Sequence, residues 1–378
     1  NRITSTLKKQ GYYLFSKDYI KFSVDTNLNE NHKMNIKVII GDFIIRHNKD
    51  SISQTSHKRF KINNIYILPD YFASLENNKE IDTTIFETKR KKSYTNKRIY
   101  YFIHKGKLNI KPAIITQSIF INPGEYFNID DVNLTYNRLS ELRNFRRITI
   151  LFEEVKPDSN NISEEYFLNC KILLPSALQQ SISFEAEGTN TGGNLGVGGN
   201  IQYENKNIFG GAEIFNFKIN SQIAIQKVFG ESKEQDISTL LPFNTIEAGG
   251  EARITLPKFL IPINPLRFSK SFRPKTSINA GYNYQKRPDY TRYIANAAFG
   301  YEWRESITKK HLLIPLELNL VKIFPSDAFK QRINAIQNIK IRNTYRDHLI
   351  TTSRWNFIVN TQPVSKRGSF MYFKAGVE

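Results

Sequence analysis

The side chains that most often carry catalysis or metal binding are sparse in this sequence and do not cluster. The six histidines are scattered, without the i, i+4 spacing or grouping of a ligand set. One cysteine, Cys170, excludes an internal disulfide framework and any multi-cysteine metal site. No Ser–His–Asp set or carboxylate pair can be defended from spacing. We therefore expect a protein that is not an enzyme and has no catalytic, cofactor or metal site. Each histidine is expected on the surface or facing a water-filled interior.

A glycine-rich segment from Gly188 to Gly199 is the one stretch that could be mistaken for a phosphate-binding loop. Such loops precede a helix and continue into Gly-Lys-Ser/Thr, whereas this segment lies between two alternating stretches. We interpret it as a hairpin turn with small residues in the flanking strands.

The charge balance is strongly basic, with 54 Lys and Arg against 35 Asp and Glu over 378 residues, a net charge of +19. The excess is spread evenly, at +9 for residues 1–175 and +10 for residues 176–378. The densest run, Lys89–Lys92, is interpreted as a solvated loop, with a phosphate-binding patch as the less favoured alternative. No motif of an RNA-binding sheet, zinc finger or basic zipper is present, so nucleic acid is not an expected partner.

Apolar patterning excludes two further classes. With 40% hydrophobic and 13% aromatic residues the chain is no disordered basic tail. No run approaches the roughly 18 consecutive apolar residues of a membrane helix.

The first half of the chain mixes helical and strand patterns. Expected elements are a helix over 2–15, strands over 18–25, 34–40 and 59–68, a polar loop over 70–97, helices over 112–119 and 129–145, and strands over 147–155 and 164–174. Residues 59–174 thus read strand, helix, helix, strand, strand, and residues 2–41 give the last three of these elements. This order indicates an internal repeat of one and a half units.

From about Ser181 the pattern becomes strict alternation. In Ser181–Thr189 the apolar set Ile182, Phe184, Ala186 and Gly188 faces opposite to Ser183, Glu185 and Glu187. Similar strands are expected over 195–205, 215–225, 246–256, 276–285, 292–304, 311–320, 349–361 and 369–377. In the stretch 311–320 the expected apolar face is Leu312, Ile314, Leu316, Leu318 and Leu320, opposite His311, Glu317 and Asn319.

Nine or so consecutive strands of this length favour a transmembrane β-barrel. Such barrels are apolar outside and polar inside, and bilayers accept strands only within a closed sheet. Aromatic residues such as Tyr282, Tyr293 and Trp303 fit interfacial girdles. A soluble sandwich usually turns every ~8–12 residues and is less consistent with strands that run past ten.

Several stretches resemble the BamA/TamA superfamily of bacterial outer-membrane insertases, in particular its TamA-like (TamL) branch. They are Leu174–Ser176 with Gln180–Ser181, Glu185–Asn190, Asn205–Glu213, Pro274–Thr276 and Tyr284–Arg292. The strand-helix-helix-strand-strand unit is similar to a polypeptide-transport-associated (POTRA) domain. Arg367-Gly368 with Phe370 matches the family's inward-loop motif only superficially and is interpreted as a turn.

The resemblance implies an α+β, β-α-α-β-β POTRA region followed by an antiparallel barrel of the bacterial surface antigen type. Residues 1–48 would be the C-terminal part of one POTRA domain, 56–175 a complete one, and 176–378 the first eight or nine of sixteen barrel strands. The implied location is the outer membrane, with the POTRA domains in the periplasm.

The implied function is assistance in inserting β-barrel or other exported proteins by pairing of strand edges at a lateral seam. Residues Ile182, Ser183, Phe184, Glu185, Ala186, Glu187 and Gly188 would pair with an unfolded client. Ile148, Ile150 and Phe152 would offer a second edge in the POTRA unit, unless Arg146, Arg147 and Lys156 guard that edge. An accessory lipoprotein or inner-membrane partner is also implied. A passive pore or receptor barrel, and a soluble basic module binding nucleic acid or polysaccharide, are the alternatives.

Overall fold

The computed structural model describes residues 2–25, 34–48, 51–70, 82–89, 97–155, 165–191, 194–225, 243–260, 272–362 and 369–378. The chain divides into two compact units, Asn1–Ala177 and Leu178–Glu378. Within the described ranges, no helix combines the length and the apolar character needed to cross a membrane.

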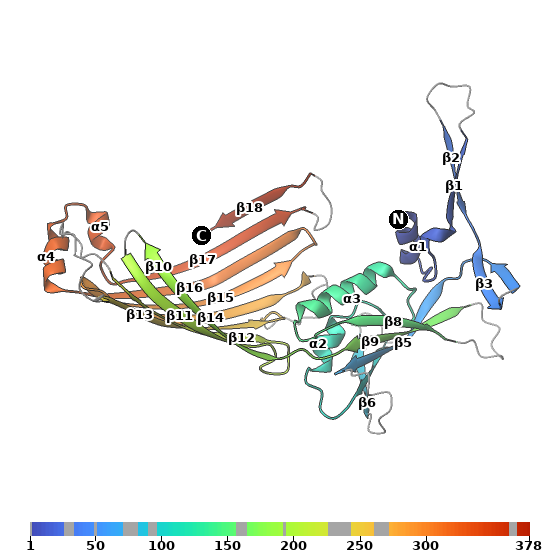
Figure 1. Ribbon diagram of the computed structural model, residues 1–378, viewed down its shortest axis with the longest axis horizontal. Helices are drawn as coiled ribbons and strands as arrows, with labels where there is room; N and C mark the ends of the chain where they lie inside the picture. Colours follow the sequence, from blue (N-terminus) through green and yellow to red (C-terminus); the bar gives the residue numbers. More distant parts are fainter. Residues whose placement is uncertain are drawn as a thin grey trace. The chain divides into compact units, whose positions relative to one another are not determined.

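The first unit is built on a five-stranded mixed sheet (Figure 1). Its strands are β5 (Phe60–Pro69), β6 (Asp82–Lys89), β7 (Lys97–His104), β8 (Thr149–Glu154) and β9 (Tyr166–Leu174), in the order β6-β7-β5-β9-β8. Helices α2 (Pro112–Gln117) and α3 (Ile129–Glu141) connect β7 to β8. The predicted strand, helix, helix, strand, strand order is therefore present. The prediction of a loop over 70–97 was wrong for the β6–β7 hairpin, which adds two strands beside β5.

The core of this unit comes from alternate residues of its two central strands. Ile65 and Ile67 of β5 and Leu168 and Ile172 of β9 are fully buried, and Leu139 of α3 packs among the buried residues with them. Cys170 is also fully buried. Period-two burial on β5 and β9 is what a sheet covered on one face requires.

The N-terminal segment adds α1 (Arg2–Lys9), a short 3₁₀ turn and two hairpins, β1 (Ile20–Asp25) with β2 (Asn35–Ile40) and β3 (Phe43–Asn48) with β4 (Ser51–Thr55). The helix expected over 2–15 ends at Lys9. Gly11 follows with φ of 104°, a conformation that favours glycine, and a Cβ at this position would lie 3.2 Å from the Tyr126 ring. The β3–β4 hairpin was not predicted.

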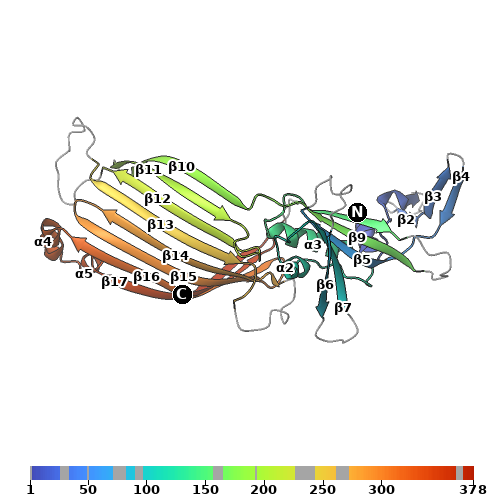
Figure 2. The ribbon, with the colours of Figure 1, turned by 90° about the horizontal axis from the view of Figure 1, so that it is seen from below.

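The second unit is a nine-stranded antiparallel sheet in which every strand pairs with its sequence neighbours (Figure 2). The strands are β10 (Gln180–Thr191), β11 (Asn194–Asn205), β12 (Ile214–Ala224), β13 (Thr245–Leu256), β14 (Lys275–Lys286), β15 (Tyr290–Arg304), β16 (Lys309–Pro325), β17 (His348–Asn360) and β18 (Tyr372–Val377). The nine predicted strands are confirmed. Each of β10 and β18 pairs with one described strand, which leaves the sheet open on two sides.

The connection from β16 to β17 holds two helices that were not predicted, α4 (Asp327–Ala335) and α5 (Ile339–Asn343). Ser326 caps α4 by accepting a hydrogen bond from the Phe329 amide at 3.4 Å. Phe329 and Ile333, one turn apart, pack with Tyr290 and Ile323 at the ends of β15 and β16.

Strand β16 contains an irregularity that changes which side chains share a face. Its register shifts against β15 between the Phe299–Leu316 and Tyr301–Leu313 pairs, and against β17 after Ile314. The alternation of side chains between the two faces is therefore interrupted at Pro315, which has no N–H to donate to a neighbouring strand. The prediction that Leu312 and Ile314 share the face of Leu316 was wrong: these two residues lie on the opposite face.

Candidate functional site

One face of the nine-stranded sheet is apolar and exposed across all of its strands. The pairing register places large exposed side chains on this apolar face: Ile182, Phe184, Val197, Ile201, Phe217, Ile219, Ile223, Ile246, Ile278, Tyr282, Leu316, Leu320, Leu349, Trp355 and Phe373. Soluble monomers rarely expose apolar patches larger than a few hundred Å². A face of this extent therefore needs a cover.

Aromatic residues gather at both ends of the apolar face. One band lies at the end of the sheet where α4 follows β16, and we call it the distal band. It is made by Tyr282, Tyr284, Tyr293 and Phe324, with the rings of Tyr284 and Tyr293 5.3 Å apart and those of Tyr293 and Phe324 5.7 Å apart. The other, the proximal band, lies at the end where β15 turns into β16 and is made by Tyr301, Trp303, His311, Trp355 and Phe357, in which the Trp303 and His311 rings stack at 4.8 Å. Between the two bands the apolar face carries mainly aliphatic and small residues, together with Phe217 and Phe299.

The separation of the bands can be worked out along β15. Tyr293 and Trp303 are ten residues apart, and Tyr293 and Tyr301 are eight apart. A rise of about 3.4 Å per residue gives about 27–34 Å along the strand. A strand tilted by about 40° then spans about 21–26 Å, which matches the apolar band of about 25 Å in transmembrane barrels.

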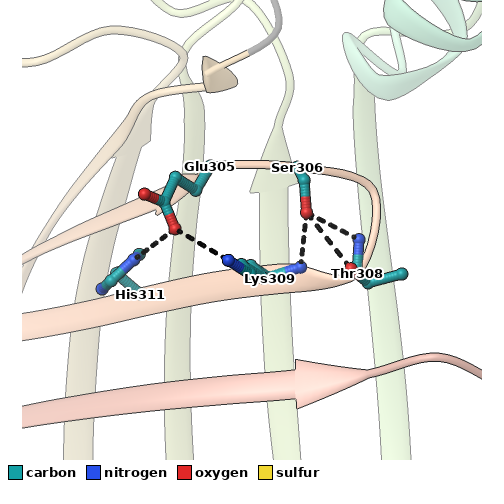
Figure 3. A network of polar contacts seen from close by, with 5 residues as sticks. All are labelled: Glu305, Ser306, Thr308, Lys309 and His311. Atoms are coloured by element: carbon teal, nitrogen blue, oxygen red, sulfur yellow. Dashed lines mark hydrogen bonds and ion pairs between the residues drawn. The ribbon is translucent and has the colours of Figure 1, made fainter.

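Figure 3 shows the polar contacts at the turn between β15 and β16, next to His311 of the proximal band. The Ser306 hydroxyl accepts hydrogen bonds from the Thr308 and Lys309 amides at 3.3 and 3.2 Å. The Glu305 carboxylate lies 4.0 Å from Lys309 Nζ and 3.7 Å from His311 Nε2. Charged side chains therefore begin where the band stops.

The opposite face of the sheet, here called the polar face, carries polar side chains that link neighbouring strands, beside Leu312 and Ile314 of β16. Asn283 and Gln285 of β14 donate to the two oxygens of Glu247 on β13 at 3.0 and 2.9 Å. Asn200 donates to Glu185 at 2.8 Å on β10–β11. Further along the sheet Lys310 pairs with Glu302 at 3.0 Å, and Arg354 pairs with Glu317. These contacts join neighbouring strands and suit a wet interior.

The first free edge belongs to β10. The Lys206 amide donates to the Gln179 carbonyl, and the Ile225 amide donates to the Leu195 carbonyl. Gln179 and Lys206 therefore form a hydrogen-bonded pair. Because such pairs alternate along an antiparallel ladder without bulges, the odd-numbered residues of β10 direct their backbone groups to β11. The even-numbered residues, Ile182, Phe184, Ala186 and Gly188, therefore turn their N–H and C=O groups to the open side. Ser183, Glu185 and Glu187 bond inward to β11.

The second free edge belongs to β8 in the first unit. The Val155 amide donates to the Phe167 carbonyl, so Ile150 and Phe152 direct their backbone groups away from β9. Ile148 lies just before the strand begins. The Phe152 ring packs on Tyr13 and Phe127 at centroid distances of 5.5 and 5.2 Å. Burial, followed by the charge of Glu154, raises the pKa of Tyr13.

Of the basic residues considered as guards of this edge, Arg146 and Arg147 are exposed just before β8. Lys156 lies outside the described residues. Arg146 also donates its amide to the Pro175 carbonyl at 2.8 Å, which ties the start of the edge to the end of β9.

In the described part of the chain, no group of three or more His, Cys, Asp or Glu could hold a metal ion. Burial strongly raises the pKa of the Cys170 thiol. His104 is 8% exposed and contacts Thr84 at 2.8 Å, so the expectation that every histidine faces solvent was wrong. Arg367 and Gly368 lie outside the described residues.

The glycine-rich segment lies in the β10–β11 hairpin, with its tip at 192–193 outside the described residues. Gly196 and Gly198 are on the polar face of β11, next to Gln222 of β12. A Cβ at Gly198 would lie 3.2 Å from the Gln222 side chain, so these positions accommodate a neighbouring amide.

No protein-family profile matches the sequence. No curated protein matches it either. Among solved structures, the chain is similar to BamA from Haemophilus ducreyi lacking POTRA domains 1-3, with a TM-score of 0.39, 12% identity, and coverage of 78% of this chain and 53% of that one. It is also similar to CdiB from Acinetobacter baumannii, with a TM-score of 0.42, 11% identity, and coverage of 80% and 58%. The chain spans little more than half the length of these two structures. We therefore base the functional proposal on the faces and edges of the sheets.

Proposed function

We propose that the chain is part of an outer-membrane β-barrel protein that assists the insertion or export of other proteins. The observation that carries this proposal is the nine-stranded sheet whose exposed apolar face is bounded by two aromatic bands. Removal of that face from water by lipid is favourable at roughly 25 cal/mol per Å². A bilayer is the cover that its extent and height fit.

Backbone pairing supports the assembly role. A strand that lies in the apolar part of a bilayer cannot leave its amides unpaired, because no water is present to bond them. The outward N–H and C=O groups of Ile182, Phe184, Ala186 and Gly188 therefore need a partner strand. A client strand that pairs there would fold against β10 as a template.

The finer part of the proposal follows the sequence resemblance. The protein would belong to the TamA-like branch of the BamA/TamA superfamily, with the first unit as POTRA domains in the periplasm. Its partners would be unfolded outer-membrane protein clients and an accessory lipoprotein or inner-membrane protein. The β8 edge, with Ile148, Ile150 and Phe152, would hold an extended client segment before it reaches β10.

The test is the rate at which a client barrel folds into liposomes that contain the full-length protein. Ala186→Pro removes one outward N–H and leaves the ladder to β11 in place, since proline is tolerated on edge strands. Loss of one backbone hydrogen bond of about 1 kcal/mol should slow client folding about fivefold. Ala186→Val retains the N–H and serves as the matched control.

Each rival reading predicts a different result. A passive pore or receptor barrel would not accelerate client folding over empty liposomes, even as the unmodified protein. A soluble basic module would remain a stable monomer in buffer without detergent, which would reject the barrel.

A further inference from the structure

Two lysines interrupt the apolar face beside the distal aromatic band. Lys286 is the last residue of β14, and Lys322 lies three residues before the end of β16. Both are exposed, and the register places them on the same face as the distal-band tyrosines. On the distal part of the apolar face, where the other large side chains are aromatic or aliphatic, two cations need an explanation.

The register brings the lysines and the aromatic rings into two adjacent rows. Tyr284 pairs with Tyr293, which in turn pairs with Lys322. One step nearer the strand ends, Lys286 pairs with Thr291, which pairs with Phe324. Lys322 Nζ lies 5.6 Å from the centre of the Phe324 ring. Both lysines are therefore register neighbours of the distal-band residues, and the Lys322 ammonium lies beside the Phe324 ring.

Neither lysine forms an ion pair with another residue in the described part of the chain. The nearby carboxylate of Asp347 accepts a hydrogen bond from the Ile323 amide at 2.7 Å, so the backbone engages it. Arg287 and Arg292 lie within 6 Å of the Tyr290 ring, which the register assigns to the opposite face. The two lysines are thus the cations that this part of the apolar face offers.

We propose that Lys286 and Lys322, together with Tyr282, Tyr284, Tyr293 and Phe324, bind the phosphate headgroup of an anionic membrane lipid whose acyl chains lie on the apolar face. This inference rests on the proposed function, because it requires that face to lie in a bilayer. A long lysine side chain covers apolar surface with its methylene groups and extends its ammonium group to the headgroup level. Tyrosines at that level contact both the acyl chains and the polar region. A phosphate supplies an anionic partner, which the described residues do not provide for either lysine.

The full-length protein is reconstituted into phosphatidylcholine nanodiscs that contain a minor fraction of phosphatidylglycerol, and the lipids that remain bound on release are counted by native mass spectrometry. The unmodified protein should retain phosphatidylglycerol in preference to phosphatidylcholine. Each of Lys286→Gln and Lys322→Gln should lower that preference about fivefold, from roughly 1 kcal/mol per lysine near an anionic surface. The double variant should lower it by up to about thirtyfold.

Two matched controls should leave the preference unchanged. The Lys286→Arg, Lys322→Arg double variant retains both charges, and Lys218→Gln removes one charge from the polar face of β12. An unchanged preference in the double Gln variant would overturn the inference, as would an equal loss in Lys218→Gln. Displacement of the lipid by inorganic phosphate would also overturn it, since the site would then bind free phosphate.

Failure of this inference is distinguishable from failure of the proposed function. Folded insertion into the discs is checked first by protease resistance. A protein that does not insert overturns both proposals, whereas intact insertion with unchanged lipid preference in the double Gln variant overturns the lipid site alone.

Discussion

Adjacent alanines on β15 offer a sharp test of which face of the sheet meets lipid. Ala297 lies on the apolar face, where it pairs with Ala280 and Leu318. It is four residues from both Tyr293 and Tyr301, so about 14 Å of strand separates it from either aromatic band. Ala297 is therefore expected at the bilayer midplane.

The neighbouring residue Ala298 is the matched control, since it lies on the polar face between Asn279 and Glu317. Arginine at the midplane of a barrel's lipid face costs about 2–4 kcal/mol, which is about 30- to 700-fold in the folding equilibrium. Ala297→Arg should show this loss, whereas Ala298→Arg should cost much less because its guanidinium reaches water and the Glu317 carboxylate.

The assay is urea-dependent folding of the full-length variants in phosphatidylcholine vesicles, read as the folded fraction at equilibrium. Equal costs for the two alanine variants would refute the assignment of faces. A larger cost for Ala298→Arg would show that the polar face is the one in contact with lipid.

Three further predictions concern the first unit. Asn128 accepts a hydrogen bond from the Asp130 amide at 2.9 Å as the N-cap of α3, so Asn128→Ala should cost about 1 kcal/mol in denaturant unfolding, and Asn133→Ala on the same helix should cost less. Burial raises the pKa of Tyr100 above 10.0, so the stability that its neutral phenol contributes is fully present below pH 10.0 and is lost as the pH rises through the folded-state pKa. In Tyr100→Phe the free energy of unfolding should therefore fall less steeply as the pH rises above 10.0. An unchanged slope of the unfolding free energy against pH would contradict this. Cys170 should resist maleimide in the native protein and react on unfolding, and rapid native labelling would contradict its burial.

The strands of the nine-stranded sheet were predictable because the alternation of apolar and polar residues holds at most of their positions. Each strand from β10 to β15 has one apolar and one polar face, as its sequence indicates. The rule failed on β16, where Leu312, Ile314 and Leu316 continue the alternation past Pro315 although the backbone does not. The proline was the signal, since a strand interior admits it mainly at an irregularity.

The missed elements carried weaker signals. Strand β6 reads Asp82-Thr-Thr-Ile-Phe-Glu-Thr-Lys89, and its polar residues fit a loop as well as an edge strand exposed to water. The helix α4 could have been found from Ser326 as a cap and from Phe329 and Ile333 one turn apart. The directions of the β10 amides could not be predicted, because they depend on which residues bond to β11.

The β10 edge also restricts what can add to it. The residues that turn their amides to the open side, among them Ile182, Phe184 and Ala186, are the same ones whose side chains lie on the apolar face. An added strand must therefore match this phase, with an apolar side chain opposite each of them. A slip of one residue would turn its polar side chains toward the lipid. Such an edge would discriminate among clients by the phase of their alternation and would tolerate wide variation in which apolar residues they carry.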